Sequence, residues 1–269
     1  MSETTNAGDV VRLEGVSKEY VTDSGDVVHA VAPTDLTVDP GELVCIVGPS
    51  GCGKSTIMDM LAGFHDPTTG RITVGGREIH GPGPDRGVVF QQPNLFPWLT
   101  VRKNVELGPR LRGVGAAERR ADAERFLHMV GLESFMDRKP YELSGGMQQR
   151  CQIARVLTND PSIILMDEPF GALDALTRER MQSELLSIWR AKRKTVLFIT
   201  HDVEEAVFLG TRVLVMSARP GRIVLDLPVR LGGPDAGPEL RSMPEFVALR
   251  DQVAASIHAA HARPAAPVG

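Results

Sequence analysis

Four short segments of this chain carry residue types that together can bind and cleave a nucleoside triphosphate. They are a glycine-rich segment at 48–56, a second glycine-containing segment at 143–150, a pair of carboxylates at 167–168 and a histidine at 201. Glycine amides and a lysine can hold phosphate oxygens, carboxylates can bind a metal ion and activate water, and a histidine can donate a hydrogen bond. The segments at 48–56 and 167–168 indicate nucleotide hydrolysis. The segment at 143–150 restricts this to a protein that closes the nucleotide between two copies of itself.

The glycine-rich segment has the spacing of a phosphate-binding loop, with two glycines five residues apart followed by lysine and serine. Glycines let consecutive backbone N–H groups turn inward, and the helix that follows directs its positive end at the same phosphates. We expect Lys54 to reach the β- and γ-phosphates, Ser55 to bind Mg²⁺ and Thr56 to support the α-phosphate. The residues expected to contact ATP in this loop are Gly48, Pro49, Ser50, Gly51, Cys52, Gly53, Lys54, Ser55 and Thr56.

Two carboxylates follow the apolar run 163–166. At the end of a strand, Asp167 is suited to bind Mg²⁺, and Glu168 can polarise the attacking water as a general base. A buried strand with a solvated acidic end would explain these two residues alone, but not their combination with a phosphate loop. His201 follows the apolar run 195–199, at the strand edge where ligands bind in open α/β folds, and can hold the γ-phosphate and orient Glu168.

The segment 143–150 has no catalytic carboxylate. Its Ser144, Gly145 and Gly146 instead precede a predicted helix at 147–157, and an exposed helix start with a hydroxyl and free amides can bind an anion. A simple helix cap with a turn explains the same local features. Because one chain cannot easily fold this helix start onto its own phosphate loop, we expect a second copy of the chain to supply it.

Apolar runs alternate along the chain with amphipathic stretches, which is typical of a parallel sheet with helices on both faces. The expected strands are 42–47, 162–166, 195–199 and 212–216, and the expected helices are 55–62, 116–130 and 177–192. An alternating stretch at 71–79, with a turn at Gly75-Gly76, indicates an additional edge strand. Residues 100–158 are mostly helical and predict a subdomain inserted into the sheet.

Composition and charge restrict the class of protein. Lysine and arginine number 30 against 34 aspartates and glutamates, and the net charge of −4 gives no electrostatic basis for binding nucleic acid. No apolar run approaches the roughly 18 residues that cross a bilayer, and the N-terminus has no secretory pattern. The three cysteines have no metal-ligand spacing. We therefore expect a cytosolic protein that reaches a membrane only through a partner chain.

The two ends of the chain differ in character from its middle. We expect residues 1–9 to be disordered. Residues 232–269 form a tail rich in proline, glycine and alanine, with one short helix expected at 244–259. The helix could pack on the core or regulate assembly, and the sequence does not distinguish these roles.

Over residues 10–231 the chain resembles the ATP-binding subunits of ATP-binding-cassette (ABC) transporters. Residues 48–56 match the Walker A loop of that family, 163–168 its Walker B strand and 143–150 its signature segment. The resemblance implies an α/β fold of the ABC type of P-loop NTPase. Such a fold has a mixed or parallel sheet core, an antiparallel β edge and an inserted α-helical subdomain, here at about 92–158.

The resemblance also assigns roles to residues outside these segments. Gln91 matches the Q-loop glutamine, which touches Mg²⁺ and links the core to the helical subdomain. Asp174 matches the D-loop at the dimer seam and belongs to the ATP site, and His201 matches the switch histidine. Tyr20 matches the aromatic residue that stacks on adenine, with ordinary packing at a sheet edge as the alternative.

A shared mechanism follows from the resemblance. Two copies would form a head-to-tail homodimer around two Mg-ATP, each bound between one Walker A loop and the other copy's Ser144, Gly145 and Gly146. Closure would move the helical subdomains and a transmembrane permease, and hydrolysis through Glu168 would reopen the dimer. The apolar surface at 91–98 resembles the groove that receives a permease coupling helix, with packing inside the subdomain as the alternative.

A finer resemblance points to importers of small anions. The segments 81–90, 95–98, 166–175 and 200–206 are similar to those of nitrate, sulfonate and taurine importer ATPases. The resemblance implies a peripheral ATPase at the cytoplasmic face of the cell membrane, with ATP and Mg²⁺ as cofactors. A periplasmic or lipid-anchored solute-binding protein would act on it indirectly, and sulfonate or taurine is favoured over nitrate.

Three other functions fit less of the sequence. An exporter ATPase is often fused to a transmembrane domain, and none is found in this sequence. Non-transport ABC ATPases usually carry long coiled-coil insertions or two cassettes, whereas this sequence has one cassette and no long heptad segment. A nucleotide kinase or GTPase would leave the segment 143–150 unexplained.

Overall fold

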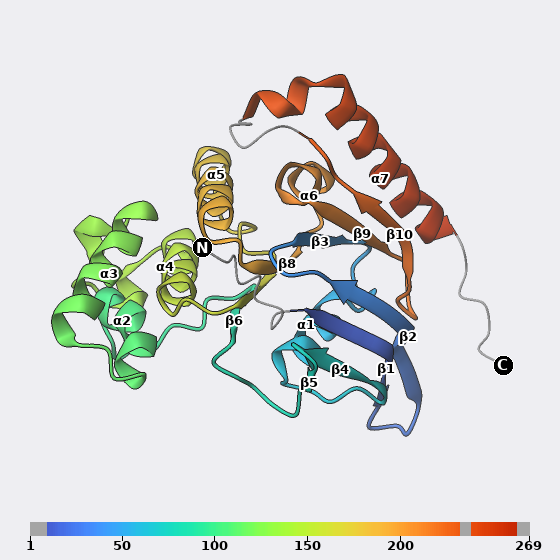
Figure 1. Cartoon of the computed structure of the whole chain (residues 1–269), viewed down its shortest axis with the longest axis horizontal. Coiled ribbons are helices and arrows are strands. Elements are labelled where there is room, and N and C mark those ends of the chain that lie inside the picture. Colours follow the sequence, from blue (N-terminus) through green and yellow to red (C-terminus); the bar gives the residue numbers. More distant parts are fainter. Residues whose placement is uncertain (1–9, 232–237, 263–269) are drawn as a thin grey trace, which may run out of the picture. The chain divides into compact units, whose positions relative to one another are not determined.

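The computed structural model describes residues 10–231 and 238–262, and the chain separates into two compact units (Figure 1). Unit 1 consists of Met1–Gly83 together with Trp189–Gly269, and unit 2 consists of Pro84–Ile188. Both units combine strands with helices. The α/β class expected from the sequence is therefore confirmed.

The domain limits expected from the sequence stay predictions. They place an ATPase domain at 10–231 with a helical subdomain at about 92–158, whereas unit 2 spans Pro84–Ile188 and contains two strands as well as helices. The disorder expected at 1–9 falls outside the described residues, as does most of the tail before and after its helix.

An antiparallel sheet forms the first part of unit 1. Its strands, in order across the sheet, are β2 (Val27–Val38), β1 (Val11–Val21), β4 (Thr69–Val74) and β5 (Arg77–Glu78). Along β1, buried Val11 and Leu13 alternate with exposed charged residues, so one face of the sheet packs on the core. The turn at Gly75 and Gly76 has positive φ angles of 57° and 76°. The predicted edge strand is confirmed as β4 and β5.

A second set of strands carries the segments of chemical interest in unit 1. In order across the sheet they are β10 (Ile223–Pro228), β9 (Arg212–Met216), β3 (Leu43–Val47) and β8 (Thr195–Ile199). β3 pairs in parallel with β8 and β9, and β10 pairs antiparallel with β9. Every residue of β3 and β8 is buried, as expected for apolar strands covered on both faces. The sheet is therefore mixed.

Three helices of different length belong to unit 1. They are α1 (Lys54–Ala62), α6 (Val203–Leu209) and α7 (Pro244–Ala262), with a 3-10 turn η3 (Pro238–Ser242) before the last. Figure 1 shows α7 lying along α6 and β10. Its Phe246, Val253 and Ala260 are buried at a spacing of seven residues, which is one stripe of a helix. The tail helix is present as expected, but it is longer than the stretch at 244–259.

Unit 2 contains two parallel strands and a group of helices. The strands are β6 (Arg86–Val89) and β7 (Ile163–Asp167). The helices are α2 (Val101–Leu111), α3 (Ala116–Met129), η1 (Glu133–Phe135), η2 (Pro140–Glu142), α4 (Gly145–Thr158) and α5 (Ala175–Lys192), which continues into unit 1. α2 packs against both α3 and α4. Gly131, with φ 65°, directly follows Val130, the C-cap of α3, and ends this helix.

Candidate functional site

The phosphate loop lies between the end of β3 and the start of α1, as its sequence predicts. Gly53 precedes α1 with φ 96°, and a Cβ at this position would lie 2.8 Å from the Val31 side chain. A Cβ on Gly48 would lie 2.7 Å from the carbonyl oxygen of Met216. Both glycines are therefore required by the packing as well as by the turn. They leave the start of α1 open to a ligand.

Lys54 is buried at 8% exposure, yet its ammonium group binds only neutral atoms of its own loop. Nζ donates to the carbonyl oxygens of Gly48 at 2.8 Å and Pro49 at 3.0 Å, and lies 3.7 Å from the Cys52 Sγ. Among the described residues no carboxylate pairs with it. A buried cation without a counter-ion is a site for an anion. Burial raises the pKa of the Cys52 thiol despite the opposing effect of Lys54, so this residue is a neutral thiol.

A loop between β9 and β10 packs directly against the phosphate loop, a contact that no sequence pattern indicates. Gly221 N donates to the Ala30 carbonyl, and a Cβ on Gly221 would lie 1.9 Å from the Cys52 carbonyl oxygen. The exposed Arg219 Nε donates to the Gly51 carbonyl at 3.4 Å. Arg219 therefore places a second positive charge at the rim of the phosphate loop. Its only local signal is an arginine among Pro and Gly residues, which surface turns commonly contain.

His201 leaves the sheet at the same edge as the phosphate loop. β8 lies directly beside β3, with Ile199 opposite Ile46 and the Thr200 N–H donating to the Ile46 carbonyl at 3.2 Å. The next helix, α6, begins at once, because Asp202 Oδ1 accepts from the first N–H groups of its first turn. The exposed His201 therefore lies between a buried strand and a capped helix, and its contact with the γ-phosphate stays a prediction.

Tyr20 lies near the end of β1 and is 37% exposed. His65 approaches the ring edge-on at 6.4 Å between centroids, and Lys18 Nζ lies 5.3 Å from the ring centre. The exposed part of the ring is compatible with stacking, and the contacts with His65 and Lys18 are compatible with edge packing. Its contact with adenine stays a prediction.

In unit 2, the two carboxylates end β7 and meet the residue that follows β6. The strands are parallel, with Met166 opposite Val89, so both chains leave at one edge. Gln91 Nε2 donates to Glu168 Oε2 at 3.3 Å. Glu168 has φ 43°, a left-handed conformation that is uncommon outside glycine. Asp167 is 9% exposed at the end of its strand.

The signature segment caps and starts α4. Ser144 Oγ accepts from Met147 N at 3.3 Å, which makes Ser144 the N-cap. A Cβ on Gly146 would lie 3.2 Å from the Ala172 carbonyl, so the helix start lies beside the chain that leads to Asp174. Asp174 Oδ1 accepts from Thr177 N, and this bond holds the pKa of Asp174 below its usual range. The helix cap and the D-loop residue are therefore neighbours.

The predicted site residues fall into two groups. Unit 1 holds Tyr20, the phosphate loop and His201, and unit 2 holds Gln91, the carboxylates, the signature segment and Asp174. Within each unit the structure brings together residues that are far apart in the sequence. The contact between Gln91 and Glu168 spans 77 positions and was not expected as a direct hydrogen bond.

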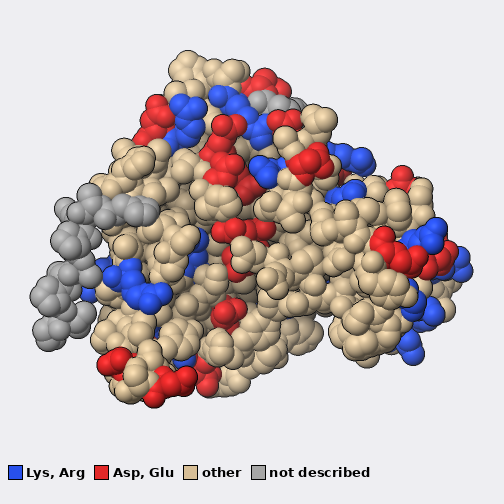
Figure 2. Space-filling model, turned by 180° about the vertical axis from the view of Figure 1, so that it is seen from behind, with Lys and Arg blue, Asp and Glu red and all other residues tan. Residues whose placement is uncertain are grey.

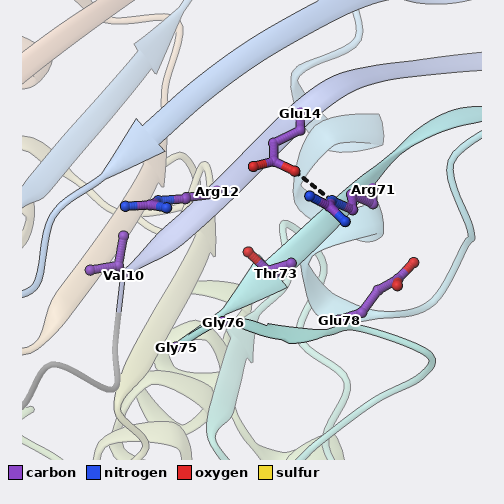
Figure 3. Close-up of a pocket in the computed structure, with 8 residues that line it drawn as sticks. All are labelled: Val10, Arg12, Glu14, Arg71, Thr73, Gly75, Gly76 and Glu78. Atoms are coloured by element: carbon purple, nitrogen blue, oxygen red, sulfur yellow. Dashed lines mark hydrogen bonds and ion pairs between the residues drawn. The ribbon is translucent and has the colours of Figure 1, made fainter.

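A surface hollow of about 470 Å³ lies on the antiparallel sheet of unit 1 (Figure 3). None of the residues predicted to bind ATP or Mg²⁺ lines it. It is lined by Val10, Arg12, Glu14, Arg71, Thr73, Gly75, Gly76 and Glu78. Glu14 forms an ion pair with Arg71, and the lining contains two arginines and two glutamates. Figure 2 likewise shows basic side chains lying among acidic ones on the face in view. Mixed charge of this kind does not favour a phosphate group.

Among the described residues, no helix is long and apolar enough to cross a membrane. Within the same part of the chain, no group of three or more histidine, cysteine, aspartate or glutamate side chains could hold a metal ion.

Three comparisons relate the chain to known proteins. The ABC transporter family model matches residues 31–171. Taurine import ATP-binding proteins of Jannaschia sp. and Pelagibacter ubique are 47% identical over 244 residues and 49% identical over 237 residues. These alignments cover 90% and 87% of this chain, and 91% and 89% of the relatives. A dimeric ATP-binding cassette in a post-hydrolysis state with ADP and Pi matches with a TM-score of 0.74 and 36% identity, covering 82% of this chain and 99% of that chain.

Proposed function

The chain belongs to the ABC transporter family, and on this premise we propose that it is the ATP-hydrolysing subunit of an importer for a small sulfonate anion of the taurine type. The observation that carries the ATPase function is the buried ammonium group of Lys54, which has no carboxylate partner among the described residues and lies within a loop suited to hold phosphate. The substrate class is supported by the printed function of relatives at 47–50% identity. An ATPase subunit does not contact the transported anion itself.

ATP binding begins with the exchange of partners at Lys54. In the free protein its ammonium group is held by the Gly48 and Pro49 carbonyls. When ATP binds, the β- and γ-phosphates replace these carbonyls, and the backbone N–H groups of the loop and of the α1 start bind the remaining oxygens. Ser55 and Thr56 lie in the first turn of α1 and support the metal and the α-phosphate.

Mg²⁺ is the cofactor that this set of residues fits. Ser55, Gln91 and Asp167 offer a hydroxyl, an amide oxygen and one carboxylate, which are oxygen donors. Mg²⁺ prefers such donors, and in nucleotide sites it is usually bound by few protein ligands together with phosphates and water. When bound, it supplies charge neutralisation for the phosphates.

Glu168 takes the proton from the water that attacks the γ-phosphate. Gln91 Nε2 donates to Oε2 of this carboxylate in the free protein, which helps to hold the Glu168 side chain in place. His201, at the neighbouring strand end, donates to the γ-phosphate and helps to orient Glu168. Tyr20 stacks on the adenine base.

The complete site is shared by two copies of the chain. Ser144, Gly145 and Gly146 of one copy bind the γ-phosphate of the ATP held by the phosphate loop of the other, and Asp174 lies at the seam. Gly145 supports this role because it is exposed and a Cβ there would meet no atom within 4 Å, so the space beside it is open. The likeness to a cassette solved as a dimer supports it as well.

The membrane partner is a transmembrane permease, and the chain acts at the cytoplasmic face of the membrane. The surface at 91–98 is proposed as its docking site, since Trp98 is 68% exposed and packs against Phe96 at 5.5 Å between ring centroids. A periplasmic or lipid-anchored solute-binding protein delivers the anion to the permease. No role for nucleic acid is proposed.

Reconstitution tests this function directly. The chain would be co-expressed with a candidate permease, inserted into vesicles, and assayed for ATPase activity with a solute-binding protein and taurine, an alkanesulfonate or nitrate. Stimulation by a sulfonate but not by nitrate is the expected result. Stimulation by nitrate alone would overturn the substrate class, and drug- or lipid-stimulated activity without a binding protein would indicate an exporter.

A further inference from the structure

Three side chains of the signature helix α4 bind the loop that carries Gln91. Gln149 Nε2 and Gln152 Nε2 both donate to the Phe90 carbonyl, at 3.1 Å and 2.7 Å. Gln152 Oε1 also accepts from Asn94 N at 2.9 Å. Arg155, one further step along the helix, donates to the Asn94 carbonyl at 2.6 Å. These bonds hold the backbone immediately before Gln91 and three residues after it.

Gln152 has the central place in this arrangement, because it alone binds both ends of the loop. Its side chain is completely buried, at 0% exposure, and both its amide nitrogen and its amide oxygen are paired. Gln149 is 1% exposed, but its Oε1 has no hydrogen-bond partner. Buried amide groups are costly unless they are paired, so Gln149 adds a second donor to Phe90 at the expense of an unmet acceptor.

One explanation for Gln152 is structural only. Loop carbonyl and N–H groups inside a protein need partners, and a glutamine could simply satisfy those of Phe90 and Asn94. The placement of the Gln91 loop indicates that Gln152 has a role beyond satisfying these backbone groups. Gln91 is exposed, and its bond to Glu168 is long at 3.3 Å, so its position is set by the backbone on either side. Gln152 fixes that backbone.

The same helix begins at the signature segment. α4 runs from Gly145 to Thr158, and Gln152 lies seven residues after its first residue, about 10 Å along a rigid helix. A ligand that moves or orders the helix start therefore moves the anchor of the Gln91 loop as well. No other element is needed between the two.

We propose that Gln152 is a positioning residue that holds Gln91 against Glu168 and couples occupation of the helix start of α4 to ATP hydrolysis. The proposal rests on the ATPase function proposed above. Gln152 itself touches neither nucleotide nor water. It acts through the backbone of Phe90 and Asn94.

The test compares two substitutions in the same helix. Gln152→Met keeps the length and volume of the side chain and removes both hydrogen bonds to the loop. Thr158→Val is the matched control, because the buried Thr158 hydroxyl binds only the Ala154 carbonyl of its own helix, at 2.7 Å. Thermal unfolding, ATP affinity, kcat and the Mg²⁺ concentration for half-maximal activity are measured for both proteins with wild type beside them.

Gln152→Met is expected to lower kcat about tenfold or more, since small misplacements of a catalytic group cost this much. It should also raise the Mg²⁺ requirement, while the affinity for ATP, set by the phosphate loop, changes less than about twofold. Thr158→Val is expected to unfold at a similarly lowered temperature with kcat unchanged. The proposal would be overturned if Gln152→Met kept the kcat and the Mg²⁺ requirement of the wild-type protein. It would also be overturned if Thr158→Val lost as much kcat as Gln152→Met.

Two additions keep the test decisive. If Gln152→Met does not fold, Gln152→Asn replaces it, because the shorter amide stays polar but cannot reach both Phe90 and Asn94. Amide hydrogen exchange is followed in all variants, and the Asn94 N–H should lose protection only when Gln152 is changed. Unchanged protection contradicts the proposal even if wild type shows no ATPase activity, a result that would by itself count only against the proposed function.

Discussion

The phosphate loop of unit 1 and the Gln91 loop of unit 2 both belong to the proposed ATPase site, but the two loops are held in different ways. The first is held by its own residues, with Lys54 bound to carbonyls five and six positions away and glycines where a side chain would collide. The second is held by a helix about 60 positions further along the chain. A local loop can bind phosphate wherever it folds, whereas a loop held from a distance can respond to what happens at that distance.

Glu168→Gln should have the largest effect on turnover and none on the phosphate loop. Removing the general base is expected to lower the hydrolysis rate by about 10²- to 10⁴-fold, while ATP still binds. The trapped ATP should hold the protein as a dimer, which light scattering with ATP and Mg²⁺ measures. Near wild-type hydrolysis, or a monomer at saturating ATP, would contradict the role of Glu168. Glu14→Gln, an exposed carboxylate in the hollow of Figure 3, is the control.

Lys54→Met changes the phosphate loop, and here we expect ATP binding itself to be weakened. Without the ammonium group the phosphates lose their charge-assisted partner, and ATP affinity should fall by about a hundredfold. Fluorescent-nucleotide titration measures this, with Lys103→Met, an exposed lysine on α2, as the control. Unchanged affinity would remove the observation on which the ATPase function stands.

Ser144→Arg tests whether the second copy of the chain contributes to the ATP site. A long cation at the start of α4 should block the nucleotide of the other copy, so hydrolysis falls by about a hundredfold while each monomer still binds ATP. Ser144→Ala controls for the lost helix cap, which costs only about 1 kcal/mol of stability. Full ATPase activity in Ser144→Arg would rule out a shared site.

Arg219→Ala is expected to have the smallest effect. The guanidinium group is exposed at the rim of the phosphate loop, where an ion pair is weak and screened by salt. ATP affinity should fall by about two- to fivefold at low salt and by less at high salt. The same titration with Arg222→Ala, on the same turn, provides the control. An equal loss of ATP affinity in both variants would show that Arg219 makes no specific contribution to ATP binding.

The difference between the two loops also explains what the sequence could predict. The phosphate loop, the buried strands at 195–199 and 212–216 and the helix start at Ser144 all depend on local spacing, and the structure has them where they were expected. Strand β10 was missed because its residues are only half buried, and α6 was not delimited because it has just seven residues. The domain limits and the roles of the site residues remain predictions.

Contacts between distant segments gave no signal in the sequence. Gln152 looks like a surface residue of an amphipathic helix, yet it is completely buried. Arg219 and Gly221 look like part of an ordinary turn, yet they pack on the phosphate loop. In each case the partner lies far away in the chain, so only the folded backbone reveals the role of the residue.

Mixing two inactive variants tests the shared site most directly. In a mixed dimer of Lys54→Met with Ser144→Arg, a head-to-tail arrangement puts both defects into one site and leaves the other intact. ATPase activity should then return on mixing, to at most about a quarter of the wild-type value, since half of the dimers carry one working site out of two. If each copy instead completed its own site, both sites of every mixed dimer would be defective. No recovery of activity, in mixtures shown to contain the mixed dimer, would contradict the shared ATP site.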